Sequence, residues 1–310
     1  MPHSNDTAPL LIFTDQADWH LRKLKAALTR RGLKPVVASL RDVAFDSALA
    51  SGLAIPGLDG RLPATVMVRG IAAGSFEAIT LRLGVLHELE ARGIPVWNPP
   101  RAIERCVDKA ATTAALVRRG IPTPLTLATE NTERARDFVV RECAAGHEVV
   151  VKPLFGSQGK GIVRIARLED LPEPEAVHGA YYLQRYIAPR DGLFRDFRVF
   201  VSAGRVVAGM IRASGTWITN VHQGGRPEAL AVTAEVERLA LAAAAAVGAA
   251  FAGVDLIVNS EGAFEVLEVN SMPAWTGLQK VAPCDVADVL VGDWLRETVP
   301  ALAVEGTGRG

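Results

Sequence analysis

A glycine-rich turn, GSQGKG at residues 156–161, stands between two β-rich runs near the middle of this 310-residue chain. Glycines allow backbone N–H groups to come close to a polyphosphate, so the turn suits a nucleotide. It is not a Walker loop, because Leu154 and Gly161 stand where that motif needs a glycine and a hydroxyl. It also lacks the glycine spacing of a dinucleotide-binding fingerprint, and a strand follows it instead of a helix. Taken alone, such a turn is more often purely structural.

Lys152 ends the apolar run VVV directly before the glycine-rich turn. A lysine in such a position is costly to bury unless it meets an anion. The lysine and the glycines are independent observations, and both indicate that this part of the chain binds phosphate.

Three oxygen-bearing side chains stand in two apolar segments near the C-terminal end, Asp255 in GVDLIV and Glu268 and Asn270 in LEVN. Glu268 and Asn270 are two residues apart, so on a strand they share one face. Oxygen ligands that converge from neighbouring strands suit Mg²⁺, which takes one or two carboxylates and completes its shell with water and phosphate. An E-x-N pair is more often a solvated strand face. Among apolar strands, however, an unpaired carboxylate is costly, which favours a metal site.

Asp196 and Arg198 alternate on one face of a further strand, and a turn near Ala203 and Gly204 returns the chain so that Arg212 lies beside them. Arginines hold carboxylate or phosphate oxygens through paired donors and stabilise negative charge that develops in acyl or phosphoryl transfer. The alternative is that these arginines pair with Asp196 and other acids, which is the commoner fate of a strand arginine.

The chain up to residue 98 alternates short apolar strands with amphipathic helices, which predicts a small parallel α/β sheet. We expect strands at 10–13, 35–40, 64–70 and 94–98, and helices at 18–32 and 75–93.

The pattern changes after Pro99 and Pro100, toward a second, smaller α/β unit of mainly antiparallel strands. The last third predicts a hairpin, a long Ala-rich helix, two more strands and a final helix. The expected elements are a helix at 102–120, strands at 148–154, 161–166 and 181–187, the hairpin at 196–212, and strands at 253–258 and 263–270.

The composition argues against a nucleic-acid-binding, secreted or membrane-spanning protein. Lys+Arg and Asp+Glu balance at 34 each, so no basic field favours nucleic acid. Three widely spaced cysteines suit a reducing compartment, and the N-terminus lacks the pattern of a secretory signal. The most apolar segment, residues 239–254, is too short and too rich in Ala and Gly to span a membrane. We therefore expect a cytoplasmic protein with no nucleic-acid or membrane partner.

Seven motifs follow one another along the chain after Arg69: DK at Asp108 and Lys109, VVVKPLFGSQGKGI, LQRYI, DFRVFV, WITNVHQGG, GVDLI and LEVNSMPA. Together they resemble the RimK-like branch of the ATP-grasp superfamily, and their order covers nearly the whole chain after Arg69. The resemblance implies an α/β (α+β) ATP-grasp fold: a pre-ATP-grasp parallel α/β domain at 1–98, a central subdomain with the glycine-rich lid at 99–187, and a C-terminal subdomain with the metal site at 188–310.

The resemblance also assigns roles to individual residues. ATP and two Mg²⁺ ions, or Mn²⁺ in their place, are the implied cofactors. The departure from the family is Arg185, where many relatives carry an acidic residue, although backbone hydrogen bonds to adenine can persist there. The implied nucleotide contacts are Lys109 and Lys152 on the phosphates, Gly156, Ser157, Gln158, Gly159 and Gly161 in the lid, Gln184, Arg185, Tyr186 and Ile187 at adenine, and Asp196 on the ribose or metal side. Asp255, Glu268 and Asn270 would ligate the metal, Arg198, Arg212 and Asn220 would face the transferred phosphoryl group and the acyl phosphate, and Arg69 would hold the carboxylate substrate.

The implied activity is that of an ATP-dependent carboxylate–amine ligase acting through an acyl-phosphate intermediate. The segment WITNVHQGG has Ile218 where ribosomal-protein-modifying members usually carry a basic residue, and it is more similar to that of tetrahydromethanopterin:glutamate ligases and amino-group-carrier ligases. This favours addition of L-glutamate to a pterin-type or similar small cofactor, and relatives of this kind also imply a homo-oligomer. Two alternatives stay open: an amino-acid ligase acting on a protein or peptide C-terminus, and a noncatalytic nucleotide-binding module.

Overall fold

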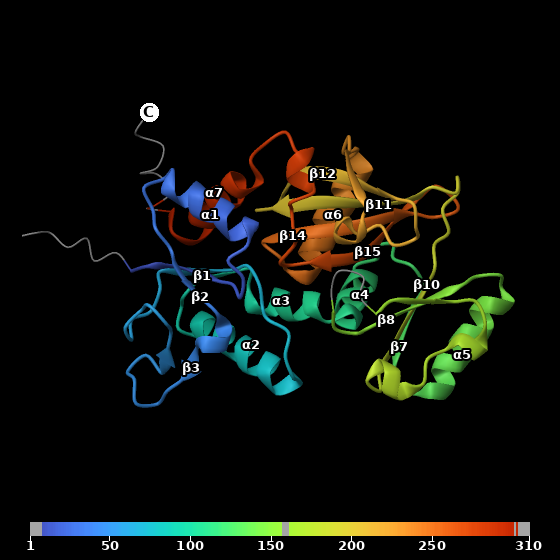
Figure 1. Ribbon diagram of the computed structural model, residues 1–310, viewed down its shortest axis with the longest axis horizontal. Coiled ribbons are helices and arrows are strands. Elements are labelled where there is room, and N and C mark those ends of the chain that lie inside the picture. The colour runs from blue at the N-terminus through green and yellow to red at the C-terminus, as the bar shows by residue number, and fades with distance from the viewer. Residues whose placement is uncertain (1–7, 157–160, 301, 303–310) are drawn as a thin grey trace, which may run out of the picture.

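The computed structural model describes residues 8–156, 161–300 and 302. Three of the residues expected in the lid, Ser157, Gln158 and Gly159, lie outside the described part of the chain, while Gly156 and Gly161 lie within it. Figure 1 shows three sheet-containing parts, with the N-terminal part in blue, the central part in green and the C-terminal part in orange and red.

The N-terminal part contains the predicted parallel sheet, in the order β2-β1-β5-β6. Helix α1 begins after Asp18, whose carboxylate accepts the N–H of Leu21, and it buries an apolar stripe that includes Leu24 and Leu28. The elements are β1 (Leu10–Phe13), α1 (Trp19–Thr29), β2 (Val36–Ala38), β5 (Thr65–Val68), α2 (Phe76–Ala91) and β6 (Val96–Trp97), with a small added hairpin of β3 (Ala44–Phe45) and β4 (Leu53–Ala54).

The single helix expected at 102–120 is wrong, because the structure has two helices there, α3 (Pro100–Val107) and α4 (Lys109–Arg118). Asp108 between them has an extended backbone, and its carboxylate accepts the N–H groups of Ala110 and Ala111. An Asp at this position starts a new helix by satisfying free N–H groups at its N-terminus. Both helices pack against elements of the C-terminal part, namely α6 and β15.

The central part is the predicted antiparallel sheet, in the order β7-β10-β8-β9. Helix α5 packs on one face of this sheet, where Phe138 and Val139 meet Val149, Val151 and Leu183. The opposite face of the central sheet is not covered by α5, and it lies toward the C-terminal part. The elements are β7 (Thr126–Thr129), α5 (Thr132–Ala144), β8 (Val149–Lys152), β9 (Val163–Ile165) and β10 (Tyr181–Arg185).

The C-terminal part is built on a five-stranded antiparallel sheet, in the order β13-β12-β11-β14-β15. The Ala-rich helix α6 covers one face, because small alanines let it approach the valines and leucines of β11, β14 and β15 closely. The elements are β11 (Phe194–Ser202), β12 (Arg205–Ser214), β13 (Arg226–Ala229), α6 (Ala234–Val247), β14 (Phe251–Val258), β15 (Phe264–Asn270) and α7 (Val286–Thr298).

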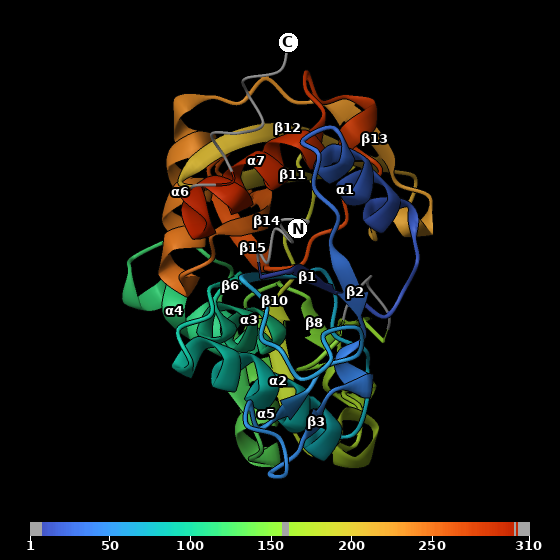
Figure 2. The same cartoon turned by 90° about the vertical axis from the view of Figure 1, so that its left-hand side faces the viewer.

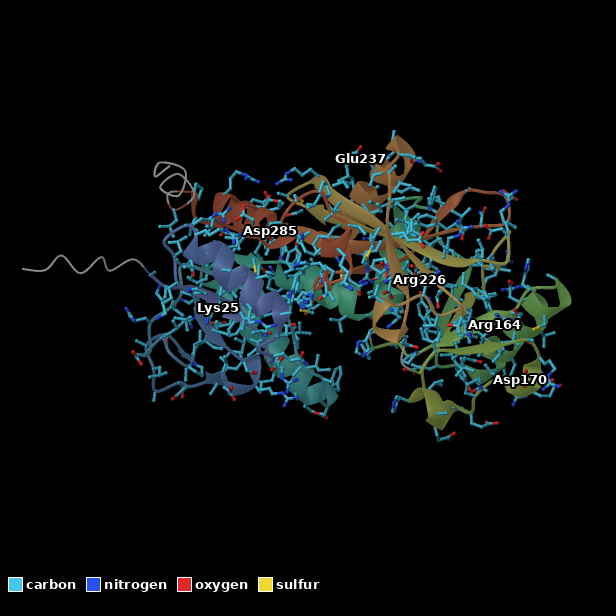
Figure 3. The ribbon with its side chains drawn as sticks, turned by 45° about the horizontal axis from the view of Figure 1, so that its top comes forward. Lys25, Arg164, Asp170, Arg226, Glu237 and Asp285 are labelled. Carbon is cyan, nitrogen blue, oxygen red and sulfur yellow. The ribbon has the colours of Figure 1, made fainter. Side chains whose placement is uncertain are left out.

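Helix α7 leaves the C-terminal sheet and packs beside α1 of the N-terminal part, as Figures 1 and 2 both show. Leu24 and Leu28 share one apolar core with Val291 and Trp294. Figure 3 labels Lys25 on α1 and Asp285 at the start of α7, on the same side of the molecule.

Each expected domain holds one of the larger sheets: the parallel sheet falls within 1–98, the central sheet within 99–187 and the five-stranded sheet within 188–310. The boundaries themselves stay a prediction, since α3, α4 and α7 pack outside the part to which they were assigned. None of the described helices is both long and apolar enough to cross a membrane.

Candidate active site

A row of charged side chains crosses one face of the five-stranded sheet. Arg212 on β12 lies opposite Asp196 on β11. Arg198, two residues further along β11, lies opposite Asp255 on β14, which in turn lies opposite Glu268 on β15. Directly opposed residues in an antiparallel pair point to the same face. The pairing therefore gathers side chains from four strands on the face that α6 leaves uncovered.

The pairing of β14 with β15 shifts register beside the site. Asp255 pairs with Glu268 and the next residue, Leu256, pairs with Val266, so that Leu267 is the extra residue of a β-bulge. A bulge breaks the strict alternation of a strand and re-aims side chains. As a result, Leu267 and Glu268 both line the cavity that faces the charged row.

Asp255 is held by both arginines of the row. Its carboxylate accepts Arg198 Nε and Nη2, each at 2.7 Å, and Arg212 Nη2 at 2.9 Å. Burial raises the pKa of this carboxyl, but the two guanidinium groups outweigh burial and lower the pKa to about 2. Asp255 is therefore an anion at neutral pH. The strand-arginine alternative, in which the arginines pair with acids, describes the contacts of Arg198 and Arg212 in this structure.

Asp196 completes the paired cluster. It accepts Arg212 Nε at 2.6 Å and the hydroxyl of Thr219 at 2.7 Å. Its pKa is raised, because burial and the neighbouring Asp255 outweigh the guanidinium of Arg212. The paired carboxylates thus differ in proton affinity, and Asp255 is the more acidic of the two.

Gly225 fixes the turn that carries Thr219 and Asn220. The Gly225 N–H donates to the carbonyl of Asn220 at 3.1 Å. A Cβ at Gly225 would stand 2.0 Å from the carbonyl oxygen of Thr219, so only glycine allows the two backbone segments to approach this closely. This close approach explains why the motif WITNVHQGG ends in a glycine.

Two lysines face the charged row from the central part and from α4. Lys152 Nζ donates to Gln184 Oε1 at 2.6 Å, and Lys109 Nζ donates to the carbonyl of Gly156 at 2.8 Å. Burial lowers the pKa of both lysines, and the Glu268 carboxylate acts against burial in each case. An anion bound beside them would repay the cost of burying two cations.

A cavity of about 140 Å³ separates the charged row from the central sheet. Asn270 lines a smaller hollow of about 20 Å³ that also touches Lys109, Lys152 and Glu268. Arg198, Gly161 and Arg69 line neither space. The predicted residues that line the larger cavity are Lys109, Lys152, Gly156, Gln184, Arg185, Tyr186, Ile187, Asp196, Arg212, Asn220, Asp255 and Glu268.

The same cavity has apolar walls contributed by both sheets. Val150 and Ile162 stand on the central side, and Ile257 and Leu267 on the C-terminal side. An adjoining cavity of about 420 Å³ shares Ile257 and Leu267 and extends along the linker after Ile187. Apolar walls next to lysines and carboxylates suit the base and the phosphates of a purine nucleotide, and we term this cavity the nucleotide slot.

Arg185 is among the residues that line the cavity, but its guanidinium points to the other side of the central sheet. Its Nε donates at 2.7 Å to the carboxylate of Glu142 on α5, while the neighbouring Gln184 points to Lys152. Adjacent residues of a strand face opposite sides of the sheet, so an arginine here leaves the polar side of the slot unchanged. Among the hydrogen bonds of the described residues, none uses the N–H of Ile187, which leaves it available to a base edge.

Arg69 lies away from the nucleotide slot, at the contact between the N-terminal and C-terminal parts. It is 9% exposed, its Nη1 donates to the carbonyl of Met272 at 3.0 Å, and its guanidinium lies 5.0 Å from the centre of the Trp275 ring. Burial lowers the pKa of Arg69 to about 10, with Asp18 acting in the opposite direction. The structure thus separates Arg69 from the other predicted residues.

The oxygen donors fit a magnesium ion that shares its ligands with phosphate. Within the described ranges, no group of three or more His, Cys, Asp or Glu side chains is placed to hold a metal by itself. Asp255 and Glu268 nevertheless lie directly opposite each other, and Asn270 Nδ2 donates to Glu268 Oε1 at 2.9 Å. Two carboxylates and one amide oxygen suit Mg²⁺, which completes its shell with water and phosphate oxygens.

Sequence reasoning missed Thr219 and Leu267. Thr219 hydrogen-bonds Asp196, and Leu267 reaches the cavity because of the bulge. Thr219 adjoins the predicted Asn220, so its position in the motif was a usable signal. No feature of the sequence indicates the bulge, since EVLEVN at 265–270 has the regular alternation of an unbroken strand.

Comparison with known proteins agrees with this geometry. The RimK-like ATP-grasp domain family matches residues 106–294 of the chain. The tetrahydromethanopterin:alpha-L-glutamate ligase of Methanococcus maripaludis is 32% identical over 298 residues, which cover 92% of this chain and 97% of that protein. The protein of the same name from Methanocaldococcus jannaschii is 42% identical over 232 residues, covering 72% of this chain and 76% of its own.

Among solved structures, the ATP-grasp ligase PsnB, complexed with a variant of its minimal precursor, Mg and ADP, superposes with a TM-score of 0.70. It is 22% identical in sequence, and the match covers 96% of this chain and 98% of PsnB. At this identity the likeness shows a shared fold, and the predicted ATP-grasp fold is confirmed.

Proposed function

This chain belongs to the RimK-like ATP-grasp family, and from that premise we propose that it joins the amino group of L-glutamate to a carboxylate of a small, pterin-type cofactor at the expense of ATP. The observation that carries the proposal is the cavity in which Lys109 and Lys152 face Asp255 and Glu268. Cations on one wall and oxygen ligands on the other suit a nucleotide triphosphate with its metal.

We assign nucleotide binding to the residues of the slot. Lys109 and Lys152 would neutralise phosphate charge, the apolar walls would hold adenine, and the backbone of Tyr186 and Ile187 would meet its edge. Gly156 and Gly161 flank the loop that would cover the phosphates. Gln184 would orient Lys152, which it already contacts at 2.6 Å.

We assign metal binding to Asp255, Glu268 and Asn270, with two Mg²⁺ ions, or Mn²⁺ in their place. Bound there, the metal would supply charge neutralisation on the phosphate oxygens. Arg198 and Arg212 hold Asp255 in position from the other side, and Asp196 in turn holds Arg212. These contacts keep the Asp255 carboxylate ionised and oriented.

The chemistry proceeds in two displacements. A carboxylate oxygen of the acceptor attacks the γ-phosphorus of ATP, the bond to the bridging oxygen breaks, and ADP leaves. The amino nitrogen of glutamate then attacks the acyl carbon, the C–O bond to phosphate breaks, and the amine loses a proton. Arg212 and Asn220 would stabilise the negative charge of these steps, and Arg69 would hold the acceptor side. Exclusion of water from the site would protect the acyl phosphate.

The substrate class rests on the relatives. The proteins of Methanococcus maripaludis and Methanocaldococcus jannaschii are named as tetrahydromethanopterin:alpha-L-glutamate ligases, and the first is matched over 97% of its length. Similarity over the whole length includes the N-terminal part, which supplies Arg69. This supports a similar acceptor for the present chain.

We also propose a homo-oligomer whose contact uses α2. Two large apolar side chains of this helix, Phe76 and Leu81, are 76% and 54% exposed. A symmetric contact between two copies would cover them. Light scattering after size exclusion would show an assembly in the wild type and a monomer in the Phe76→Ser, Leu81→Ser double variant; a monomeric wild type would refute this proposal.

The test of the ligase is product formation. ADP and phosphate release is followed with Mg²⁺, ATP and L-glutamate against a panel of carboxylate acceptors that includes tetrahydromethanopterin-type pterins and peptides, with mass spectrometry of the products. A glutamate-sized mass gain on a pterin, with one ADP per bond, is the expected result. A gain on a peptide would replace the acceptor class, and ATP binding without turnover on any acceptor would favour a noncatalytic nucleotide-binding module.

A further inference from the structure

The loop 271–276 begins directly after Asn270, and side chains of the N-terminal part form hydrogen bonds with its backbone. Asn98 Nδ2 donates to the carbonyl of Ser271 at 2.6 Å, and Arg69 Nη1 donates to the carbonyl of Met272 at 3.0 Å. His20 Nε2 lies 3.1 Å from the backbone N of Trp275. Hydrogen bonds from separate elements thus fix the backbone of the segment that follows β15, the strand that carries the proposed metal ligands Glu268 and Asn270.

His20 can make its contacts in one protonation state. Its Nδ1 lies 2.7 Å from Asp18 Oδ2, and its Nε2 faces the N–H of Trp275 and, at 3.2 Å, the hydroxyl of Thr276. A backbone N–H is always a donor, so Nε2 must accept and the proton must sit on Nδ1, where it donates to Asp18. The ring is therefore neutral.

Trp275 connects this histidine to Arg69. The indole is fully buried, and its ring lies edge-on to His20, with the ring centres 4.5 Å apart. The guanidinium of Arg69 stands over the same indole at 5.0 Å. Arg69 Nε is buried without a hydrogen-bond partner, so the group depends on this ring contact and on Met272 for its placement.

The charged groups that face His20 act against each other. Asp18 at the start of α1 favours the protonated ring, while Arg69 at the end of β5 disfavours it. The loop 271–276, with the sequence SMPAWT, contributes no ionisable side chain. Burial, followed by Arg69, lowers the pKa of His20 despite Asp18. The neutral ring that the hydrogen bonds require is thus the form that its surroundings stabilise.

We propose that His20 is a positioning residue which holds the loop 271–276, and through Trp275 sets the guanidinium of Arg69 for the acceptor carboxylate. The part concerning the acceptor rests on the function proposed above. Protonation of His20 would turn Nε2 from an acceptor into a donor facing the N–H of Trp275. As the pH falls, the loop would then lose its hydrogen bond to His20, and Trp275 would no longer be fixed beside the guanidinium of Arg69.

Three variants separate this role from general stability. His20→Ala removes the acceptor, and His20→Gln retains an acceptor oxygen near the place of Nε2 that does not titrate. His87→Gln is the matched control, since His87 contacts Glu104 at the surface, away from the loop. Thermal unfolding of each variant shows which of them are folded.

The first measurement needs no substrate. Hydrogen–deuterium exchange at neutral pH should be accelerated roughly tenfold at the amides of the 271–276 peptide in His20→Ala, and unchanged in His20→Gln and His87→Gln, as expected for loss of a buried hydrogen bond. ¹⁵N NMR of the labelled histidine rings should show His20 as the Nδ1–H tautomer, titrating below the ordinary histidine value. Unchanged exchange in His20→Ala, or an Nε2–H tautomer, would overturn the proposal.

The second measurement uses an acceptor identified in the panel. His20→Ala should raise KM for the acceptor about tenfold with KM for ATP unchanged. The acceptor KM of the wild type should rise at acid pH, and that acid limb should be absent in His20→Gln. Equal effects of His20→Ala on both KM values would refute the positioning role. If no acceptor turns over, the proposed function fails, and the exchange and NMR results still decide whether His20 holds the loop.

Discussion

Asp255 and Glu268 lie directly opposite each other on neighbouring strands, one step from the bulge that shifts their register. Like charges in directly opposed positions destabilise a sheet. The surrounding cations offset this repulsion: Arg198 and Arg212 contact Asp255, and Lys109 and Lys152 act on Glu268 through space. The pair therefore depends on the positive charge around it, and a metal ion held by Asp255 and Glu268 would add to that charge.

Replacing Glu268 by Gln should lower kcat roughly a hundredfold or more while the fold stays intact, because the proposed metal ligand loses its charge. Steady-state kinetics across a Mg²⁺ titration measures the effect. Glu265→Gln on the same strand is the control, since Glu265 contacts Asn259 outside the nucleotide cavity. Full activity of Glu268→Gln, or of the wild type after removal of divalent metal, would reject the metal assignment.

Arg185 and Gln184 should respond differently to alanine. Arg185→Ala leaves the buried Glu142 with a weaker partner, so we expect a loss of roughly 1–3 kcal/mol in the free energy of unfolding and little change in KM for ATP. Gln184→Ala should raise KM for ATP, because Lys152 loses its orienting contact. Urea unfolding and ATP kinetics on both variants test this. A large ATP effect in Arg185→Ala would mean that its side chain reaches the nucleotide.

Gly225→Ala should destabilise the turn that holds Thr219. The added methyl would meet the Thr219 carbonyl, so the backbone must move, at a cost of roughly 1–3 kcal/mol. The hydrogen bond from Thr219 to Asp196 is strained by the same movement, and activity should fall with stability. Gly215→Ala is the control, because a Cβ there meets nothing within 4 Å. Equal stability of the two variants would show that the turn relaxes freely.

The acid stability of the protein should depend on Asp255. Its pKa of about 2 lies below the ordinary 3.8, so its stabilising effect is complete above pH 4 and is lost as the pH falls through 2. The difference corresponds to on the order of 2 kcal/mol. Urea unfolding at several pH values should show a smaller acid loss in Asp255→Asn than in the wild type. The variant Asp137→Asn, on the exposed side of α5, should retain the wild-type slope, and identical slopes in all three proteins would contradict the pairing.

Replacing Arg69 by Ala should raise KM for the acceptor roughly tenfold or more and leave KM for ATP unchanged. The physical reason is that Arg69 does not line the nucleotide cavity and lies instead at the contact between the N-terminal and C-terminal parts. Arg92→Ala, which removes a surface pair with Glu88, serves as the control. Equal weakening of both substrates would remove Arg69 from the acceptor site.

The sequence predicted the elements whose periodicity is local. The parallel sheet up to residue 98, the antiparallel central sheet and the hairpin of β11 and β12 all appear where the patterns placed them. The lysines, the carboxylates and the hinge strand also meet at one cavity. The sheets and the hairpin follow from alternation, glycine and apolar runs, each of which acts over a few residues, whereas the roles of Lys109 and the hinge strand are implied by the family resemblance.

What the sequence could not give depends on tertiary contacts. The cap at Asp108 is local, but an aspartate also occurs inside helices, so the break shows only once α3 and α4 are each packed against α6 and β15. The bulge at Leu267 shows only in the register of β14 with β15. The orientation of Arg185 followed only once Glu142 was placed behind the sheet. Likewise, nothing local in His20 predicted a contact with Trp275, which lies far along the chain.

The packing of α7 against α1 has a consequence for biosynthesis. The apolar side of α1 is translated long before Val291 and Trp294, which cover it in the folded chain. Until then that side faces water or a chaperone, and the N-terminal sheet lacks part of its core. Loss of the α7 segment by premature termination would therefore leave the N-terminal part without this cover, and such products should aggregate or be degraded.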